Sequence, residues 1–394
     1  MEITESLDSE TFAFEETREE TSLDQVVKGM FQLASHLTDP ACRAHETFRW
    51  MCVVDTLHPH ESPLTNLARK GALVVALMGW GGLALVTTLP GVALRYLGAR
   101  LASQPYTAMK GKEDSKTLPK DRIFTLLSWN ICGISGGYSI SDGGVYPWRF
   151  RTDRVIDTIL KKDADVVCLS EVFDIQMGLC LYERLKSEGY THFYFNMGTL
   201  PIGVPSGLFV ASKYQIKNPE FTRFPLESLV GRTQNNAKGV FAFDLKSHNQ
   251  TFATVLTTHL QHSEEPEFPT SEEVAARLKQ MEIVNAKASK VRDRCVIVTG
   301  DLNLDDREYH QARWHWSYEK GLPPLERKTW GGDAFCASLV GQRISGPLNL
   351  DHTMLLKGSA QSIQTELVET GYCPKRFQEV ALSDHEGLLS TISL

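Results

Sequence analysis

Between residues 123 and 394, one apolar run after another borders on a polar side chain that a buried strand does not need. These side chains are Asn130, Glu171, His259, Asp301, Asn303, Asp351, Asp384 and His385. Taken singly, most allow a plain reading, since an asparagine or an aspartate after a glycine suits a turn and an aspartate can cap a helix. Because loops at strand ends are where a rigid scaffold presents functional groups, the repetition favours one shared site.

The residue types in this set are those of metal-assisted phosphoester hydrolysis. Carboxylate and amide oxygens suit Mg²⁺, and Mn²⁺ or Co²⁺ are the alternatives. Two histidines supply a proton acceptor and a proton donor, one on either side of a phosphorus centre. The chain has no GxxxxGK[ST] phosphate loop, and "GISGG" at 133–137 is too loose for one. A phosphoester is therefore the expected substrate.

The apolar runs predict an α/β fold in which two sheets pack together. The predicted strands are 123–129, 165–169, 208–211, 239–245, 252–257, 295–299, 350–355 and 388–392. Helices are expected at 154–160 and 179–185, and a third begins at Thr270, where Glu273 completes a capping box. These elements define a catalytic domain over 123–394.

The N-terminal third has a different composition. Residues 1–25 hold nine acidic residues and one basic residue, a charge of -8, which predicts a disordered acidic tail. Since the whole chain carries -7, the remainder is about +1 and gives no support for nucleic-acid binding. Residues 26–102 are expected to be helical, with a stop at Asp39–Pro40, and residues 103–122 are expected to be a linker.

An uncharged stretch of 24 residues runs from 71 to 94 inside that helical region. About twenty apolar residues suffice to cross a bilayer, and Arg69, Lys70, Arg95 and Arg100 flank the stretch. Three glycines and Pro90 interrupt it, so two short lobes forming a hairpin, or a helical hairpin packed on the catalytic domain, are alternatives to one span. We expect a phospholipid membrane as a partner and leave the mode of contact open.

Eight cysteines are scattered along the chain without a CxxC pair. Several lie in apolar runs, which favours buried thiols over disulfides or zinc ligands. The catalytic domain is therefore expected to face a reducing, cytosolic compartment. A bacterial effector at a host membrane would fit the same features, and protein partners are not predicted.

The ordered series WN, E, H, GDxN, D and SDH resembles the endonuclease/exonuclease/phosphatase superfamily of magnesium-dependent phosphodiesterases, over about 123–394. The resemblance implies a four-layer α/β/β/α sandwich like that of deoxyribonuclease, preceded here by a helical, partly hydrophobic region. Within the superfamily, "EVFD" at 171–174 and "THLQ" at 258–261 are similar to the neutral sphingomyelinases. Ser170 stands where abasic-site nucleases have glutamine, and Glu386–Gly387 replaces the usual aromatic–proline pair after SDH.

The resemblance implies how the metal and the substrate are held. Glu171 would be the leading metal ligand, with Asn130 and Asp384 in the same network. Phe173, in the "EVFD" segment, and Lys238, in a "KG" pair before a strand, match positions that contact substrate. Magnesium is the implied cofactor.

The remaining residues receive catalytic roles by the same resemblance. His385 would be the general base, oriented by Asp351. Asp301 and Asn303 would hold the attacking water and a phosphate oxygen. His259 would stabilise charge on the phosphate or protonate the leaving group, and the division of labour between the two histidines stays open.

These expectations together predict a membrane-associated, Mg²⁺-dependent phosphodiesterase that cleaves a phospholipid head group, with sphingomyelin as the favoured substrate. The alternatives are a deoxyribonuclease-like nuclease, a phosphoinositide phosphatase of the same superfamily, and a membrane-anchored scaffold with an inactive catalytic fold. The phosphatase is disfavoured because its proline-tryptophan-cysteine-aspartate-arginine signature is not found in the sequence.

Overall fold

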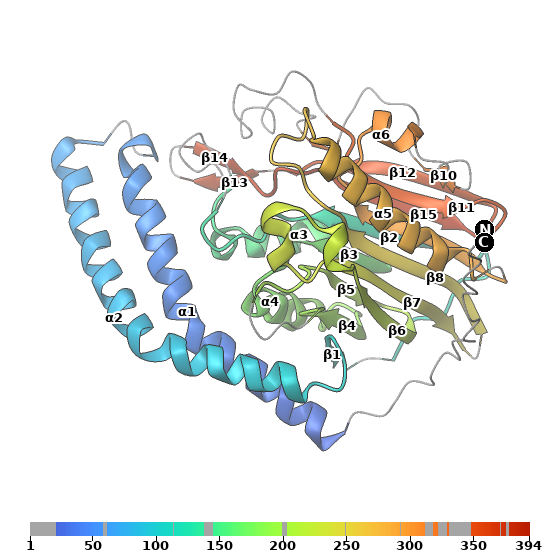
Figure 1. The fold of residues 1–394 in the computed structure, drawn as a ribbon, viewed down its shortest axis with the longest axis horizontal. Coiled ribbons are helices and arrows are strands. Elements are labelled where there is room, and N and C mark those ends of the chain that lie inside the picture. The colour runs from blue at the N-terminus through green and yellow to red at the C-terminus, as the bar shows by residue number, and fades with distance from the viewer. Residues whose placement is uncertain are drawn as a thin grey trace, which may run out of the picture.

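A computed structural model describes residues 21–394 apart from 58–60, 113, 138–144, 199–202, 249, 292, 312–317, 322–328, 331–347, 371 and 376–377. Most of the predicted acidic tail, residues 1–20, lies outside the described residues. The described part of the chain begins with two long helices and continues into two packed sheets (Figure 1).

The first sheet has seven strands. In spatial order they are β1 (Thr107–Lys110), β4 (His192–Phe195), β5 (Phe209–Ser212), β3 (Val166–Ser170), β2 (Ile123–Asn130), β15 (Gly387–Ser393) and β12 (Ser362–Val368). Helices α3 (Thr152–Lys162) and α4 (Ile175–Leu185) follow β2 and β3 in the chain. Three short 3₁₀ turns, at Trp148–Phe150, Leu226–Ser228 and Gly231–Asn235, lie in the connections.

The second sheet has six strands. In spatial order they are β10 (Tyr318–Lys320), β11 (Asp351–Leu356), β9 (Cys295–Asp301), β8 (Gln250–His259), β7 (Gly239–Ser247) and β6 (Gln215–Arg223). Helix α5 (Ser271–Ala288) connects β8 to β9, and a short helix, α6 (Asp306–Gln311), follows β9. A separate hairpin is formed by β13 (Tyr372–Lys375) and β14 (Gln378–Ala381).

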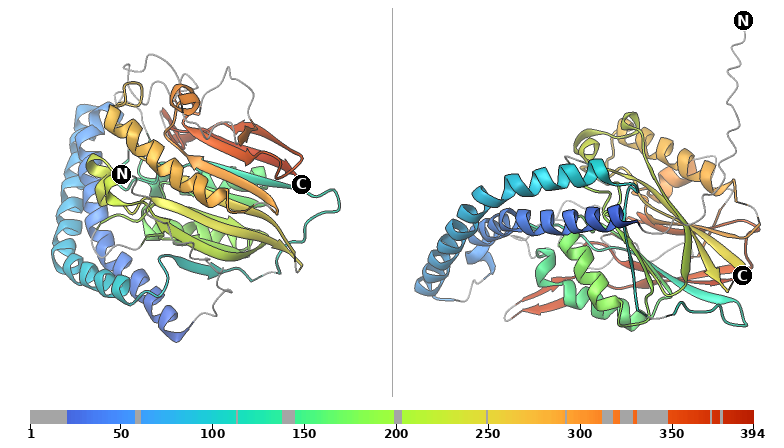
Figure 2. Two further views of the ribbon diagram at one scale, coloured as in Figure 1. Left: turned by 45° about the vertical axis from the view of Figure 1, so that its right-hand side comes forward. Right: turned by 90° about the horizontal axis from the view of Figure 1, so that it is seen from below.

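The two sheets pack face to face and helices cover their outer faces, which makes four layers (Figures 1 and 2). The two faces of one strand pack into different layers. Phe124 of β2 lies between the sheets, whereas Leu127 packs under α3 and α4. Val298 of β9 similarly packs under α5. Strands that are buried on both faces are apolar along their whole length, and for this reason they were recognisable in the sequence. The predicted sandwich and the capping box of α5 at Thr270 are confirmed.

Two parallel strand pairs determine where the polar strand ends meet. Strands β2 and β3 run parallel with Asn130 opposite Ser170, so Asn130 and the following residue, Glu171, leave the sheet at one end. Strands β8 and β9 run parallel with His259 opposite Asp301, and Asp351 of the antiparallel β11 lies opposite Asp301 as well. The register of both sheets therefore delivers these side chains to the same end of the sandwich.

Helices α1 (Ser22–Leu57) and α2 (Pro63–Leu101) form an antiparallel pair along one side of the sandwich (Figure 1). The backbones approach closely because Gly91 leaves room for Thr38: a Cβ at Gly91 would lie 2.9 Å from the Thr38 methyl carbon. The α1 helix also contacts the catalytic domain, where Gln176 Nε2 donates to Ser35 Oγ over 2.7 Å. Arg149 pairs there with Asp39 and Glu46 of α1.

Three features of the N-terminal region differ from the readings that the sequence allowed. Helix α1 runs through Pro40 instead of stopping there, because packing along α2 holds it together across the missing backbone donor. Helix α2 is continuous through Pro90, so two lobes folding back within 71–94 are excluded. The expected linker 103–122 contains β1, whose backbone pairs with β4 at the outer edge of the first sheet.

Candidate active site

The polar strand ends line a cleft of about 760 Å³ at one end of the two packed sheets. Eight of the predicted site residues line this cleft, namely Glu171, Phe173, Lys238, His259, Asp301, Asn303, Asp384 and His385. Asn130 and Asp351 are buried behind them and bond to members of the set. The structure therefore brings all ten predicted residues together, and their individual roles remain predictions.

Asn130 joins the carboxylates of the two sheets. Its Nδ2 donates to Asp301 Oδ2 over 2.9 Å and lies 3.2 Å from Glu171 Oε1. Its Oδ1 accepts the backbone N–H of Cys132 over 3.0 Å. Because the amide oxygen is already engaged, Asn130 orients the two carboxylates in this conformation. Direct ligation of a metal by Asn130 stays a prediction.

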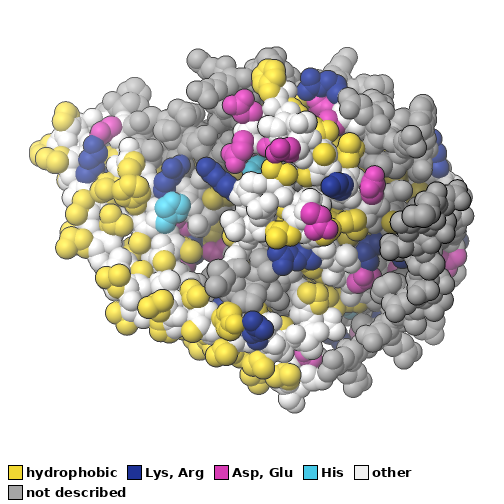
Figure 3. All heavy atoms as spheres, in the orientation of Figure 1, with side chains coloured by type: hydrophobic (Ala, Val, Ile, Leu, Met, Phe, Trp, Pro, Cys, Tyr) yellow, Lys and Arg dark blue, Asp and Glu magenta, His cyan; other side chains and the backbone are white. Residues whose placement is uncertain are grey.

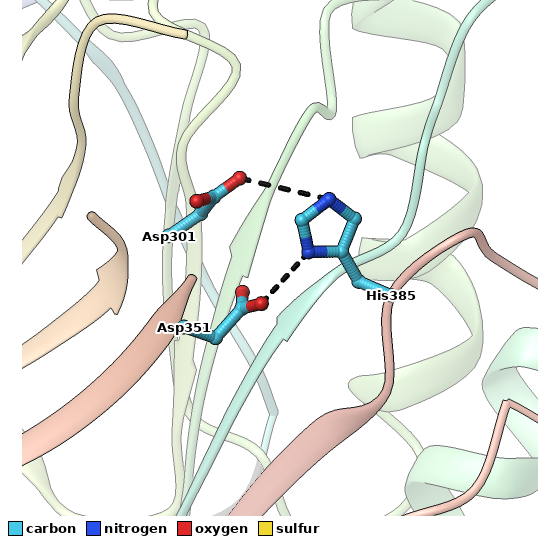
Figure 4. Close-up of side chains that lie close together, drawn as sticks. All are labelled: Asp301, Asp351 and His385. Carbon is cyan, nitrogen blue, oxygen red and sulfur yellow. Dashed lines mark hydrogen bonds and ion pairs between the residues drawn. The ribbon is translucent and has the colours of Figure 1, made fainter. Parts of the chain in front are cut away.

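His385 and Asp351 form the shortest side-chain contact of the site, 2.7 Å between Nδ1 and a carboxylate oxygen (Figure 4). The backbone of His385 is held as well, since Trp129 Nε1 donates to the His385 carbonyl over 2.9 Å. Asp351 is held in turn by its backbone N–H, which donates to Thr329 Oγ1 over 3.0 Å. The pairing of a histidine with an orienting carboxylate is the arrangement that a general base requires.

Asp301 lies between the two histidines. Its Oδ2 is 3.5 Å from His259 Nε2 and 3.9 Å from His385 Nε2, and Figure 4 shows the His385 ring reaching both Asp301 and Asp351. The second oxygen, Oδ1, accepts the backbone N–H of Asn303 over 2.9 Å. His259 Nδ1 and Asn303 Nδ2 are buried without a hydrogen-bond partner among the described residues. The described residues thus leave one polar atom unsatisfied on each of two side chains that line the cleft.

Burial and neighbouring charges shift the pKa values of the carboxylates in this cleft. Burial and the neighbouring Asp384 raise the pKa of Glu171 to about 7. Burial also raises the pKa of Asp351 to about 6, against the effect of His385. Burial alone would raise the pKa of Asp301 too, but His385 and His259 outweigh it and hold that pKa below its ordinary value.

The pKa values of the two histidines and of Lys238 are shifted in different directions. Burial and Lys238 hold the pKa of His259 well below its ordinary value. Burial lowers the pKa of Lys238 to about 7, against the attraction of Asp301 and Glu171. For His385 the carboxylates Asp351 and Asp384 outweigh burial, and its pKa is raised well above the ordinary value.

The donor set fits a divalent cation. A buried carboxylate is costly unless a cation offsets its charge, and Glu171 faces Asp384 and Asp301 in one cleft. Asp301, Asp351 and His385 offer ligand atoms that all lie within 4.8 Å of one another, so they form a second candidate set of ligands. Sequence reasoning gave those three residues catalytic roles and did not foresee that they could act as ligands.

Two site residues have a strained backbone. Glu171 has φ of 65° and Asn303 has φ of 49°, in the left-handed region that non-glycine residues seldom occupy. The turn at Glu171 is tight, because a Cβ on Gly133 would lie 2.1 Å from the Glu171 carbonyl oxygen. Such strain persists only where the surroundings hold it, and it gathers at functional sites.

Sequence reasoning missed Arg151. The residue is 1% exposed, and its guanidinium donates to four backbone carbonyls: Tyr146 over 2.8 Å, Ile131 over 2.6 Å, and also Cys132 and Leu382. Arg151 thus ties the loop after Asn130 to the loop before Asp384. The only signal was its place in "YPWRFRTDRVI" at 146–156, which indicates a matching segment and not a role.

Comparison with known proteins identifies the fold. The model of the endonuclease/exonuclease/phosphatase family matches residues 127–385, about two thirds of the chain. A double mutant of beta toxin from Staphylococcus aureus with bound magnesium ions is 20% identical, with a TM-score of 0.54 over 69% of this chain and 99% of that chain. Sphingomyelinase C from Streptomyces griseocarneus is 18% identical, with a TM-score of 0.51 over 68% and 99%.

A further similar structure comes from another kind of protein. TDP2 from Caenorhabditis elegans is 17% identical, with a TM-score of 0.51 over 82% of this chain and 85% of that chain. At these identities the structures show a common fold and leave the substrate of this chain undetermined.

Proposed function

Because the chain belongs to the endonuclease/exonuclease/phosphatase family, we propose that this metal-dependent phosphodiesterase uses Mg²⁺ to hydrolyse the head group of a phospholipid, with sphingomyelin as the favoured substrate. The observation that carries the proposal is the convergence in one cleft of carboxylate, amide and imidazole groups from both sheets. Cleavage of sphingomyelin would give ceramide and phosphocholine.

Each group has a chemical task in this proposal. A divalent cation held at Glu171 and Asp384 would polarise the phosphate and lower the pKa of a water molecule. A cation there would also offset the carboxylates that raise the pKa of His385, and the neutral imidazole, oriented by Asp351, takes the proton of the attacking water. The free Asn303 amide N–H groups bind a phosphate oxygen, and His259 faces the developing charge or the leaving oxygen.

The rim of the cleft supports a cationic head group. Three acidic side chains and three aromatic side chains line it, namely Glu264, Glu265, Glu267, Phe173, Phe268 and Trp330. A quaternary ammonium is attracted both by carboxylates and by the faces of aromatic rings. A choline head group would place its positive charge against this rim while its phosphate lies at the histidines.

The same rim disfavours a nuclease. Polynucleotide binding depends on neutralising several phosphates with lysine and arginine side chains. Among the described lining residues there are two lysine or arginine side chains, Arg232 and Lys238. The Arg232 side chain lies 3.8 Å from Glu264, and Lys238 is buried. A polyanion would therefore meet three glutamates at the mouth of the cleft.

Helix α2 supports a location at a membrane. By length and composition it could cross a bilayer, and no part of its most apolar stretch is buried. Figure 3 shows hydrophobic side chains along the left and lower edge of the molecule, where α2 runs. We propose that this helix attaches the enzyme to a phospholipid membrane, with the catalytic domain on the cytosolic side or, for a bacterial effector, at a host membrane.

The test is a substrate panel with the purified full-length protein. Vesicles of sphingomyelin, phosphatidylcholine or phosphoinositide and supercoiled DNA are each incubated with Mg²⁺, Mn²⁺, Co²⁺ or chelator. We expect Mg²⁺-dependent release of phosphocholine from sphingomyelin above all. Robust DNA nicking without phosphocholine release would overturn the proposal.

Two variants serve as controls. His385→Ala should abolish turnover on every substrate, whereas Lys357→Gln, at an exposed side chain in the turn after β11, should leave turnover unchanged. An unchanged cellular effect of His385→Ala, together with no hydrolysis by the wild type, would favour the scaffold alternative.

A further inference from the structure

A second cleft, of about 770 Å³, lies at the edge of the sandwich remote from the active site. It is bounded by β1 and β6, which are outer strands of the two sheets, by β4, and by the beginning of α1. His192 of β4 pairs with Ser212, which pairs with Val166 at the beginning of β3, whereas the active site lies beyond the end of β3. None of the described residues lines both clefts.

This edge cleft gathers positive charge. Lys28, Lys110 and Lys217 line it, and Lys110 lies directly opposite His192 in the β1–β4 ladder. Burial, with the charges of Lys110 and Lys217, lowers the pKa of His192 to about 4. Holding Lys110 and Lys217 close to one another and to His192 is unfavourable without a nearby negative charge, so the arrangement indicates a site for an anion.

The nearby carboxylates are already engaged. Asp24, the one acidic residue among the described lining residues, accepts hydrogen bonds from Thr21 and Ser103. Asp244, opposite Lys217 in the ladder, accepts hydrogen bonds from Asn218 and Thr254 and lies 3.3 Å from Arg294. Among the described residues, neither Lys110 nor Lys217 has a carboxylate oxygen within ion-pair distance.

The other wall of the edge cleft is apolar and aromatic. Phe31 of α1, Ile216 of β6 and the edge-to-face pair Tyr106–Tyr194, whose ring centroids are 5.4 Å apart, form it. A few charged groups beside an apolar surface are typical of a ligand pocket. A small inorganic anion would use the lysines and leave this wall without a partner.

We propose that the edge cleft is a second binding site, which takes a phosphate monoester attached to an apolar group. Lys110 and Lys217 bind the phosphate, and the wall around Tyr106 and Tyr194 packs against the apolar part. The monoester can come from a lipid such as phosphatidic acid or from a soluble molecule. The proposal does not depend on the substrate of the active site.

The experiment measures binding to the full-length protein by calorimetry at low ionic strength, with chelator present so that the catalytic cleft holds no divalent metal. The probes are inorganic phosphate, short-chain phosphatidic acid below its micelle concentration, and phosphatidylcholine vesicles with and without phosphatidic acid. The variant is Lys110→Gln/Lys217→Gln. The matched control is Lys161→Gln/Lys357→Gln, which removes two exposed charges elsewhere.

We expect the cleft variant to bind short-chain phosphatidic acid about tenfold or more weakly, from two lost charge contacts, and the control to bind as the wild type does. The rate of Mg²⁺-dependent phosphodiester hydrolysis should be the same in both variants as in the wild type. Tighter binding to vesicles that contain phosphatidic acid than to the short-chain probe would indicate that the monoester comes from a membrane lipid. Equal binding to both would indicate a soluble molecule.

Three results would overturn the proposal: no binding of any phosphate probe by the wild type, equal affinity in the two double variants, or binding of polyglutamate that phosphate probes fail to displace. The last result would assign the edge cleft to an acidic peptide. Thermal unfolding of both variants, expected at the wild-type midpoint because the replaced side chains are exposed or half-buried, excludes misfolding.

Discussion

Replacing Arg151 with methionine removes the group that joins the two loops of the active site. The guanidinium bonds to the carbonyls of Ile131 and Cys132, directly after Asn130, and to the carbonyl of Leu382, directly before the Ser383–His385 turn. Methionine fills much of the same space with an apolar side chain and has no donor. The change therefore tests whether these loops need Arg151 to hold their geometry.

The expected loss of stability follows from the bonds. Four carbonyls lose a charged donor. Three of them, at Ile131, Cys132 and Tyr146, belong to the segment between β2 and α3, and the fourth is that of Leu382. A single hydrogen bond to a charged group contributes about 1.5–3 kcal/mol, and four bonds made by one side chain contribute less than their sum because they are not independent. We expect the free energy of unfolding to fall by about 4 kcal/mol, and Arg151→Lys, with one donor group, to lose about half as much.

Urea unfolding measures this loss, and the Mg²⁺ dependence of phosphodiester hydrolysis measures positioning. The control is Leu181→Ala, a cavity in the buried face of α4 that should cost about 2–5 kcal/mol. Under conditions where both variants are folded, Arg151→Met should need more Mg²⁺ for half-maximal rate and have a lower kcat, while Leu181→Ala should match the wild type. Equal kinetics in the two variants would refute a positioning role, and an unchanged urea midpoint for Arg151→Met would refute the structural reasoning altogether.

Four further changes test other parts of the structure. Gly300→Ala should destabilise the fold by more than about 3 kcal/mol in urea, because φ is 135° and a Cβ would lie 1.9 Å from a backbone oxygen of β8. Folding lowers the pKa of His192 to about 4. The neutral side chain therefore contributes fully to the free energy of unfolding above about pH 6.5, and this contribution is lost as the pH falls from there towards 4. The free energy of unfolding of His192→Gln should depend less on pH across that window, with a difference from the wild type on the order of 3 kcal/mol. Leu85→Glu/Val86→Glu, at side chains 83% and 71% exposed on α2, should reduce binding to vesicles about tenfold or more in flotation and leave the thermal midpoint unchanged. Mg²⁺ should raise the thermal midpoint of the wild type and have little effect on Glu171→Gln, and an equal rise in both would remove Glu171 from the metal site.

The strands that carry the site were predictable because they are buried on both faces. Strands β2, β3, β8 and β9 lie between a second sheet and a helix layer, so their sequences are apolar runs that end abruptly in a polar residue. Strand β12 alternates exposed and half-buried residues over most of its length, as "SIQTELV", and gives no such signal. Strand β1, with four residues at a sheet edge, owes its conformation to pairing with β4. Tertiary contacts decided these elements, and the local sequence did not.

The polar residues show the same limit within the site. The chemistry of Asn130 could be read from its position at a strand end, but its partners could not, because Asp301 is 171 residues away and meets it only through the packing of one sheet on the other. Arg151 was invisible for a related reason: it contacts backbone carbonyls, and any residue type supplies a carbonyl. A pattern of side chains therefore predicts which groups reach the substrate, whereas the groups that hold them in place emerge only from the fold. For this chain the distinction separates Glu171, His259 and His385, which the sequence places in the cleft, from Arg151 and Thr329, which the structure places behind it.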